Sequence, residues 1–188
     1  MCMLRMLLSA ALSLLTMLGA PQTTGPDSKS VSEPEFADVF YRLDAGTLQP
    51  LERQNLTYKG KASGFMVMNM KTVSEFPGGR STVRFKGGQQ LDFVVRTAFA
   101  PSAVDPNSVY CLRKLSTTKK TREIVIMAGH LSPVGGSTTV GFAGGVLPVN
   151  FSRYGSSSLK LSTTAELPSG EYALGRMYGP TVFCFGVD

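Results

Sequence analysis

The chain has 188 residues and a net charge of +6, with 20 glycines, 11 prolines, no tryptophan and one histidine. This length suits one domain with a real core, because a domain near this size buries roughly 70% of its extended-chain surface. The basic excess is modest and lacks clustering with interleaved aromatic residues, so no nucleic-acid partner is predicted. Many glycines and prolines between short alternating runs favour an all-β fold.

The first 20 residues have the order of a secretory signal peptide. A basic segment ending at Arg5 precedes an apolar run over 6–18, which is too short to span a bilayer of ~30 Å comfortably as a helix. Gly19 and Ala20 are small residues suited to cleavage, while Pro21 leaves the cleaved bond open. We predict a signal peptide over 1–20 that is the chain's only membrane contact, with an uncleaved anchor or a buried helix as the alternatives.

The mature chain divides into a leader and one domain. Residues 21–35 are rich in proline, threonine, serine and glycine without apolar periodicity, which predicts a disordered leader. Residues 36–188 are predicted to form a single domain of about ten strands, because alternating apolar runs are bounded by turns throughout. Strands are expected within 37–43, 48–53, 57–63, 65–73, 82–86, 91–96, 109–115, 124–127, 146–151 and 159–161, with a closing hairpin over 167–188.

The closing hairpin indicates the architecture. Pro168 and Gly170 make a tight corner, and Tyr172 follows at the start of the penultimate strand. This corner resembles the one in immunoglobulin-like sandwiches, where a tyrosine hydroxyl bonds to an upstream backbone group. We therefore predict an antiparallel, immunoglobulin-like β-sandwich, with a closed β-barrel as the alternative. An ordinary core tyrosine is the alternative for Tyr172.

Cys111 and Cys184 are the only cysteines after the predicted signal peptide, and each lies in the middle of a predicted strand. An exported protein meets an oxidising compartment, so a disulfide between them is predicted. Two buried free thiols, which behave as small hydrophobic side chains, are the alternative.

A catalytic centre is harder to find. His130 is the single histidine, which argues against a histidine-based zinc site, and we predict no metal, cofactor or catalytic residue. Ser132 and Ser137 lie close to it in sequence, so a Ser-His pair is conceivable, although no Gly-x-Ser-x-Gly motif accompanies it. Scattered carboxylates leave open a glycosidase-type pair assembled by the fold.

Two segments are predicted to be binding loops, because loops at the ends of a sandwich commonly carry recognition. One is 100–108, and the other is the glycine-rich stretch 129–145. The candidate residues in the second stretch are Gly129, His130, Gly135, Gly136, Gly144 and Gly145. Before it, Met66, Met68 and Met70 alternate along a predicted strand. This alternation favours core filling, with a strip that binds a soft metal or a partner as the alternative.

Three motifs carry a resemblance. They are Tyr-Arg-Leu-Asp followed by Gly-Thr-Leu-Gln-Pro-Leu-Glu over 41–52, Gly-Glu-Tyr-Ala over 170–173, and Phe-Cys-Phe-Gly-Val-Asp over 183–188. The pattern resembles secreted bacterial proteins of unassigned function that share a "YxLD…GxLxPLE" opening and a "PGEYA…FxFGVD" ending. The resemblance spans 40–188, with Pro-Ser-Gly here in place of Pro-Pro-Gly. It implies a bacterial, exported β domain and no particular reaction.

These observations favour an exported, non-enzymatic binding or surface-interaction module in the periplasm, on the cell surface or in the medium. An envelope glycan or protein is the candidate partner. The alternatives are a hydrolase of envelope polymers, using a carboxylate pair or a Ser-His pair, and a structural component of an envelope assembly.

Overall fold

The computed structural model describes residues 31–64, 68–140 and 145–188. The predicted signal peptide and residues 21–30 of the predicted leader lie outside these ranges. The described chain contacts the body already at Glu33, before the predicted domain boundary at residue 36. The Glu33 carboxylate accepts hydrogen bonds from the Ser158 hydroxyl at 2.6 Å and from the backbone of Ser156 and Ser157. These bonds, led by that of Ser158, outweigh burial and lower the pKa of Glu33 to about 2.

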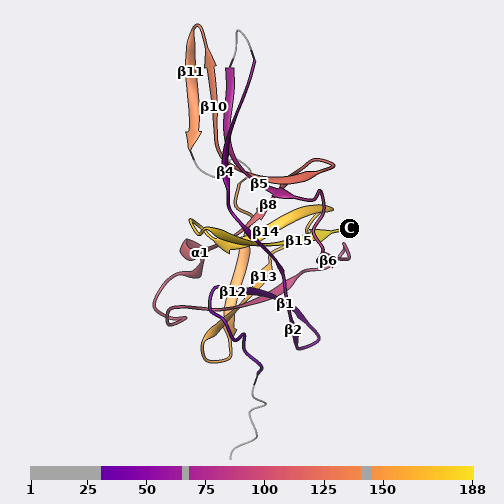
Figure 1. Cartoon of the computed structure of the whole chain (residues 1–188). Helices are drawn as coiled ribbons and strands as arrows, with labels where there is room; N and C mark the ends of the chain where they lie inside the picture. The colour runs from indigo at the N-terminus through magenta and orange to yellow at the C-terminus, as the bar shows by residue number, and fades with distance from the viewer. Residues whose placement is uncertain (1–30, 65–67, 141–144) are drawn as a thin grey trace, which may run out of the picture.

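The described residues form fifteen strands, one four-residue helix and three sheets (Figure 1). Sheet A has the order β12 (Val149–Tyr154), β13 (Ser158–Thr163), β7 (Asp92–Arg96), β1 (Phe40–Asp44) and β2 (Thr47–Pro50). Sheet B has the order β3 (Glu52–Asn55), β15 (Thr181–Val187), β14 (Gly170–Arg176) and β8 (Tyr110–Lys114), with β6 (Arg84–Phe85) parallel to β15. Sheet C has the order β11 (Gly135–Val140), β10 (Thr121–Ser132), β5 (Met68–Pro77) and β4 (Tyr58–Ser63), with β9 (Ser116–Thr117) on β10. Helix α1 is Pro106–Val109.

Sheets A and B pack face to face around the main core. Alternate residues of each strand point inward, so Phe93 of β7 meets Phe185 of β15 with ring centroids 4.9 Å apart. Tyr172 of β14 stacks on the same phenylalanine at 5.5 Å. Burying a side chain of this size contributes about 1.5–3 kcal/mol, so this aromatic cluster is a major source of stability. The predicted antiparallel β-sandwich is confirmed, and in the described ranges none of the three sheets closes into a barrel.

Sheet B is covered on both faces. The opposite face of β14 and β15 presents Ala173, Val182 and Cys184, which pack on Phe76 of β5 and Ile124 of β10. The strands β14 and β15 are consequently buried along almost their whole length. Sheet C thus adds a third layer to the sandwich. The parts of β5 and β10 next to the body are held there by packing against sheet B.

The chain has more strands than predicted because some apolar runs change sheets. The run over 48–53 divides at Leu51, which is buried, so β2 joins sheet A and β3 joins sheet B. Leu51 donates its backbone N–H to the carbonyl of Phe40 at 3.3 Å, which fixes the crossing. Pro50 ends β2, the terminal strand of sheet A, where a missing N–H costs no ladder bond.

The predicted corner holds the closing hairpin. The Tyr172 hydroxyl donates a hydrogen bond to the carbonyl of Pro168 at 2.6 Å. Gly170 adopts φ 156°, a conformation that side chains rarely allow, and a Cβ there would come within 3.2 Å of the Lys114 side chain. The corner therefore positions the start of β14, which lies between β15 and β8 in sheet B.

The predicted disulfide is wrong. Cys111 lies on β8 and Cys184 on β15, and both are buried free thiols. Strand β14 runs between them, pairing with β8 on one side and β15 on the other. Cys111 lies opposite Gly175 and Cys184 opposite Ala173, so two strand spacings plus this offset put the Cα atoms more than about 9 Å apart. A disulfide can bridge only ~7 Å. Burial raises the pKa of both thiols, that of Cys184 to about 12.

Candidate functional site

Sheet C continues beyond the body as a four-stranded arm (Figure 1). The arm consists of β4, β11 and the outer parts of β5 and β10. Residues 129–136, predicted as part of a loop, belong to it: β10 runs to Ser132, a tight turn follows, and β11 begins at Gly135. The register bulges between Val125 and Met127, near the level where the arm leaves the body. Such bulges bend a strand and increase its twist.

One face of the arm is apolar, and cross-strand register defines it. Ala62, Met70, Gly129 and Thr138 form one row across the four strands. Residues directly opposite in antiparallel strands share a face. The next row inward pairs Thr72 with Met127, and the next row outward pairs Met68 with Leu131. We call this surface the apolar arm face.

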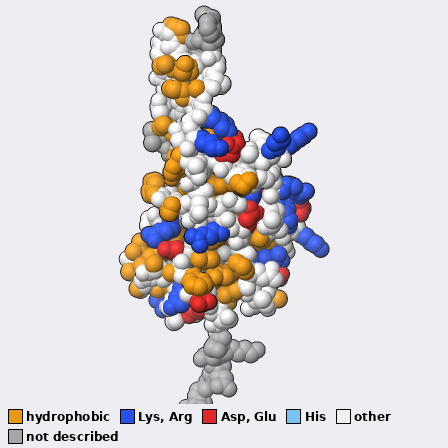
Figure 2. All heavy atoms as spheres, in the orientation of Figure 1, with side chains coloured by type: hydrophobic (Ala, Val, Ile, Leu, Met, Phe, Trp, Pro, Cys, Tyr) orange, Lys and Arg blue, Asp and Glu red, His pale blue; other side chains and the backbone are white. Residues whose placement is uncertain are grey.

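The apolar arm face is solvent-exposed. Met68, Met70, Met127 and Leu131 retain 40%, 43%, 37% and 51% exposure. Figure 2 shows hydrophobic side chains gathered along the arm. The predicted core-filling role is therefore wrong for Met68 and Met70, while Met66 lies outside the described residues. On β5, Phe76 occupies the same face and belongs to the buried cluster between sheets B and C. The apolar arm face continues this cluster outward, and within the described residues no further sheet lies over it.

A hollow of about 350 Å³ marks this surface, and its lining includes Gly60, Met70, Met127, Gly129 and Thr138. Glycine creates much of the depression, since Gly60 and Gly129 present no side chain where flanking residues rise. A Cβ at Gly129 would lie 3.4 Å from the Thr138 hydroxyl, which is an ordinary van der Waals contact.

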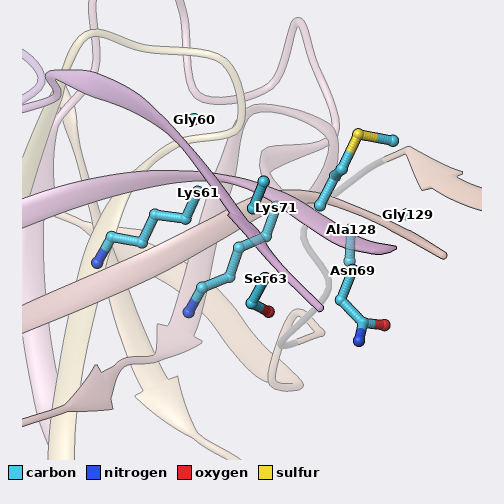
Figure 3. Close-up of a pocket in the computed structure, with 9 residues that line it drawn as sticks. Gly60, Lys61, Ser63, Asn69, Lys71, Ala128 and Gly129 are labelled. Carbon is cyan, nitrogen blue, oxygen red and sulfur yellow. The ribbon is translucent and has the colours of Figure 1, made fainter. Parts of the chain in front are cut away.

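The opposite face of the arm is polar and basic. Figure 3 shows Lys61, Lys71, Ser63 and Asn69 pointing to one side, where a second hollow of about 710 Å³ lies. At the base, Lys61 and Lys71 both bind the buried carboxylate of Glu123, the latter at 3.0 Å. The hydrogen bond from Lys61 is the largest of the effects that lower the pKa of Glu123. The arm therefore has one charged face and one apolar face.

The Ser-His pair that the sequence leaves conceivable lies, together with Asn69, in one row of this polar face. Ser137 lies opposite His130 in the register of β10 and β11, and Asn69 lies opposite His130 on the other side. The Nδ1 atom of His130 is 3.1 Å from Oδ1 of Asn69. Within the described residues no hydrogen bond joins Ser137 to His130, and the row lies on an exposed strand surface. Sequence reasoning missed Asn69 because it is 61 positions from His130.

The remaining residues of the predicted binding loops lie in different parts of the chain. Gly136 lies in β11, where a Cβ would be 2.9 Å from the carbonyl oxygen of His130, so the close approach of β10 explains this glycine. Gly144 lies outside the described residues, and Gly145 is exposed just before residue 146. The other predicted loop, 100–108, carries the start of α1 and lies on the body (Figure 1). The two segments therefore do not form one site.

The fold does assemble two carboxylates. Glu52 and Glu171 both accept hydrogen bonds from Ser81, whose hydroxyl is 2.6 Å from Glu52 and whose backbone N–H is 2.7 Å from Glu171. Arg122, which is 1% exposed, pairs with Glu52 at 2.5 Å, and Arg84 pairs with Glu171. Burial opposes ionisation of Glu52, but the bonds from Arg122 and Ser81 outweigh it and lower its pKa to about 2.

This cluster explains the sequence motifs. Glu52 ends the first motif, Glu171 lies in the second, and Asp188 ends the third. Arg84 binds both Glu171 and Asp188, the latter through Nη2 at 2.6 Å. A Cβ at Gly186 would overlap the Arg84 guanidinium, so the glycine of the last motif makes room for the cluster. We call these residues the body ion network, and their arrangement is that of a structural clamp.

Comparison with known proteins adds no relative. No family model, curated protein or solved structure matches the chain. In the part of the chain that the structure describes, no helix is long and apolar enough to cross a membrane. In the same ranges, no three histidine, cysteine or acidic side chains gather as a metal site.

Proposed function

We propose that this protein is an exported, non-enzymatic interaction module whose apolar arm face binds a partner protein. The observation that carries this proposal is the exposed group of Met68, Met70, Met127 and Leu131 on one face of a projecting sheet. Exposed apolar surface rimmed by polar groups commonly marks an interaction site. The resemblance to secreted bacterial proteins supports export.

The chemistry of this face favours a protein partner. Methionine is unbranched and polarisable, and it is used on surfaces that adapt to a partner's shape. The lysines of the arm, Lys59, Lys61 and Lys71, lie on the opposite face and are already paired with Glu75 or Glu123. The apolar arm face would therefore meet an uncharged, apolar row on the partner, with little contribution from charge.

The position of the arm also favours presentation to a partner. The start of the described chain, drawn in indigo, lies at the end of the body remote from the arm (Figure 1). A chain held to an envelope through its leader would thus direct the arm outward. This geometry supports surface interaction over a role in which the arm folds back on its own leader.

A hydrolase is the second candidate, and the Ser137–His130–Asn69 row is the observation that favours it. The carboxylate pair does not, because a general acid needs a raised pKa and Glu52 has a lowered one. Assaying the wild type and His130→Ala on envelope polysaccharides, peptides and esters separates the two proposals. Turnover that disappears in the variant would replace the interaction module with a Ser-His hydrolase.

A photo-crosslinking side chain at Leu131 tests the interaction directly. The matched control carries the same group at Gln49, an exposed position on β2 of the body. After irradiation in the producing cell, we expect a discrete protein adduct from position 131 and none from position 49. The same adducts from both positions, or none from either, would refute the proposal. A lipid adduct from position 131 would assign the face to a membrane instead.

A further inference from the structure

The edge of the arm formed by β11 differs from the other sheet edges. A terminal strand exposes unpaired N–H and C=O groups, and proteins commonly guard it with charge or proline. At the other ends of the three strand orders, setting aside the two-residue strands β6 and β9, the terminal strands follow this rule. Their guarding residues are Arg153 on β12, Pro50 on β2, Arg53 on β3, Lys114 on β8, and Lys59 and Lys61 on β4. Strand β11, Gly-Gly-Ser-Thr-Thr-Val, carries neither charge nor proline.

The charges of the arm are placed asymmetrically. Lys59 and Lys61 lie on β4 and Lys71 on β5, at or next to the edge opposite β11. Two copies that met through β4 would bring lysines together, which is unfavourable. Two copies that met through β11 would keep all these lysines at the outer edges. The charge pattern therefore permits self-association at one edge and opposes it at the other.

We propose that β11 pairs antiparallel with β11 of a second copy of this chain, across a two-fold axis. Antiparallel pairing of one edge with its own copy is self-complementary, as an isologous interface requires. It also directs the two bodies to opposite ends of the joined sheet, because each arm projects from its body (Figure 1). This edge is distinct from the apolar arm face, which both copies would still present.

A second copy fits this edge better than a foreign strand. Strand addition gains affinity from main-chain hydrogen bonds and selects foreign sequences through pockets for alternate side chains. Gly135, Gly136 and Ser137 are too small to build such pockets. The six residues of β11 offer a short ladder, so we expect a weak dimer with a dissociation constant in the micromolar range.

Sedimentation of the full chain purified from its producing cell tests the proposal. The test variant is Ser137→Lys/Thr138→Lys, which puts one lysine on each face of β11, where a two-fold axis near the middle of the strand brings like charges together. The control is Ala62→Lys/Ser63→Lys, which adds the same charge to the β4 edge. We expect the β11 variant to weaken dimerisation by about tenfold or more, since like charges would meet across the axis. The β4 variant should retain the wild-type dissociation constant.

Hydrogen exchange identifies the interface. The amides of β11 should become more protected as protein concentration rises, while those of β4 should not change. A wild type that remains monomeric to about 100 µM would overturn the proposal. Equal effects of the two variants, or protection of β11 that requires another protein, would do so as well. Each double variant also adds one lysine to the apolar arm face, at Thr138 or at Ala62, so equal effects would assign self-association to that face. Protection of the β11 amides in the wild type reports the edge alone, so the two proposals can fail separately.

Discussion

Replacing Glu52 by glutamine tests the body ion network most directly. Glu52→Gln keeps the side-chain shape but leaves the buried Arg122 guanidinium without its hydrogen-bonded carboxylate. Removing one partner of a buried pair costs about 3–5 kcal/mol. The pKa of Glu52, about 2 against an ordinary value of 4.5, corresponds to about 3 kcal/mol of stabilisation. Both routes predict a loss of about 3 kcal/mol in the free energy of unfolding at pH 7.

The same substitution has a pH signature. Because the pKa of Glu52 is lower in the folded state, its contribution is complete above the unfolded pKa of 4.5 and is lost as pH falls towards 2. The difference between wild type and Glu52→Gln should therefore shrink as pH falls from 5 towards 2. Urea unfolding followed by far-ultraviolet circular dichroism at several pH values measures it.

Glu75→Gln is the matched control. Glu75 is also paired with lysines, Lys59 at 3.1 Å and Lys61 at 3.5 Å, but on the exposed face of the arm. Exposed pairs contribute little, so its unfolding midpoint should barely move. An unchanged midpoint for Glu52→Gln at pH 7, or a difference from wild type that stays constant down to pH 2, would refute the account of the network.

Three further predictions concern the body. Tyr172→Phe removes the hydrogen bond at the corner and should lower the free energy of unfolding by about 1 kcal/mol, measured by urea unfolding. Gly186→Ala forces a methyl group against the Arg84 guanidinium and should cost about 1–3 kcal/mol in the same measurement. Cys111 and Cys184 should react with thiol reagents only after denaturation, and reduction should leave the intact mass unchanged.

Each of these has a clear contrary result. An unchanged midpoint for Tyr172→Phe would mean that water replaces the corner bond without cost. Gly60→Ala is the control for the glycine variant, since nothing lies within 4 Å of a Cβ built there. Equal effects at Gly60 and Gly186 would contradict the steric explanation. A mass gain of two hydrogen atoms on reduction would show that a disulfide is present.

Period-two alternation predicted the fold class because it indicates that a segment is a strand and which of its residues share a face. It does not report what covers a face. Met68 and Met70 alternate like core residues, yet their strand has left the body, so the same pattern produced an exposed surface. The glycines led to the opposite error. Gly129 and Gly136 weaken strand propensity, so their segment was predicted to be a loop. Both nevertheless lie in strands, and the close approach of β10 to β11 requires the glycine at 136.

Long-range contacts were beyond sequence reasoning. Glu52 and Arg122 are 70 positions apart, and only the pairing of β3 with β15 beneath sheet C brings them together. The disulfide prediction was wrong for the same reason. Sequence alone does not distinguish two cysteines on adjacent strands from two cysteines separated by an intervening strand. The tyrosine corner was accessible, since Tyr172 and Pro168 lie four residues apart.

The placement of charge explains how the fold tolerates an uncovered arm. The sequence motifs concentrate in the body, where buried carboxylates and guanidinium groups clamp sheet B to its neighbours. Strands β5 and β10 begin or end in this clamped region through Phe76 and Ile124, so the arm is anchored by core packing at its base. Packing at the base of sheet C therefore stabilises its strands. The outer residues of the arm do not have to be buried to keep these strands folded. Strands that need no further burial to stay folded can keep an apolar face and an unguarded edge for association.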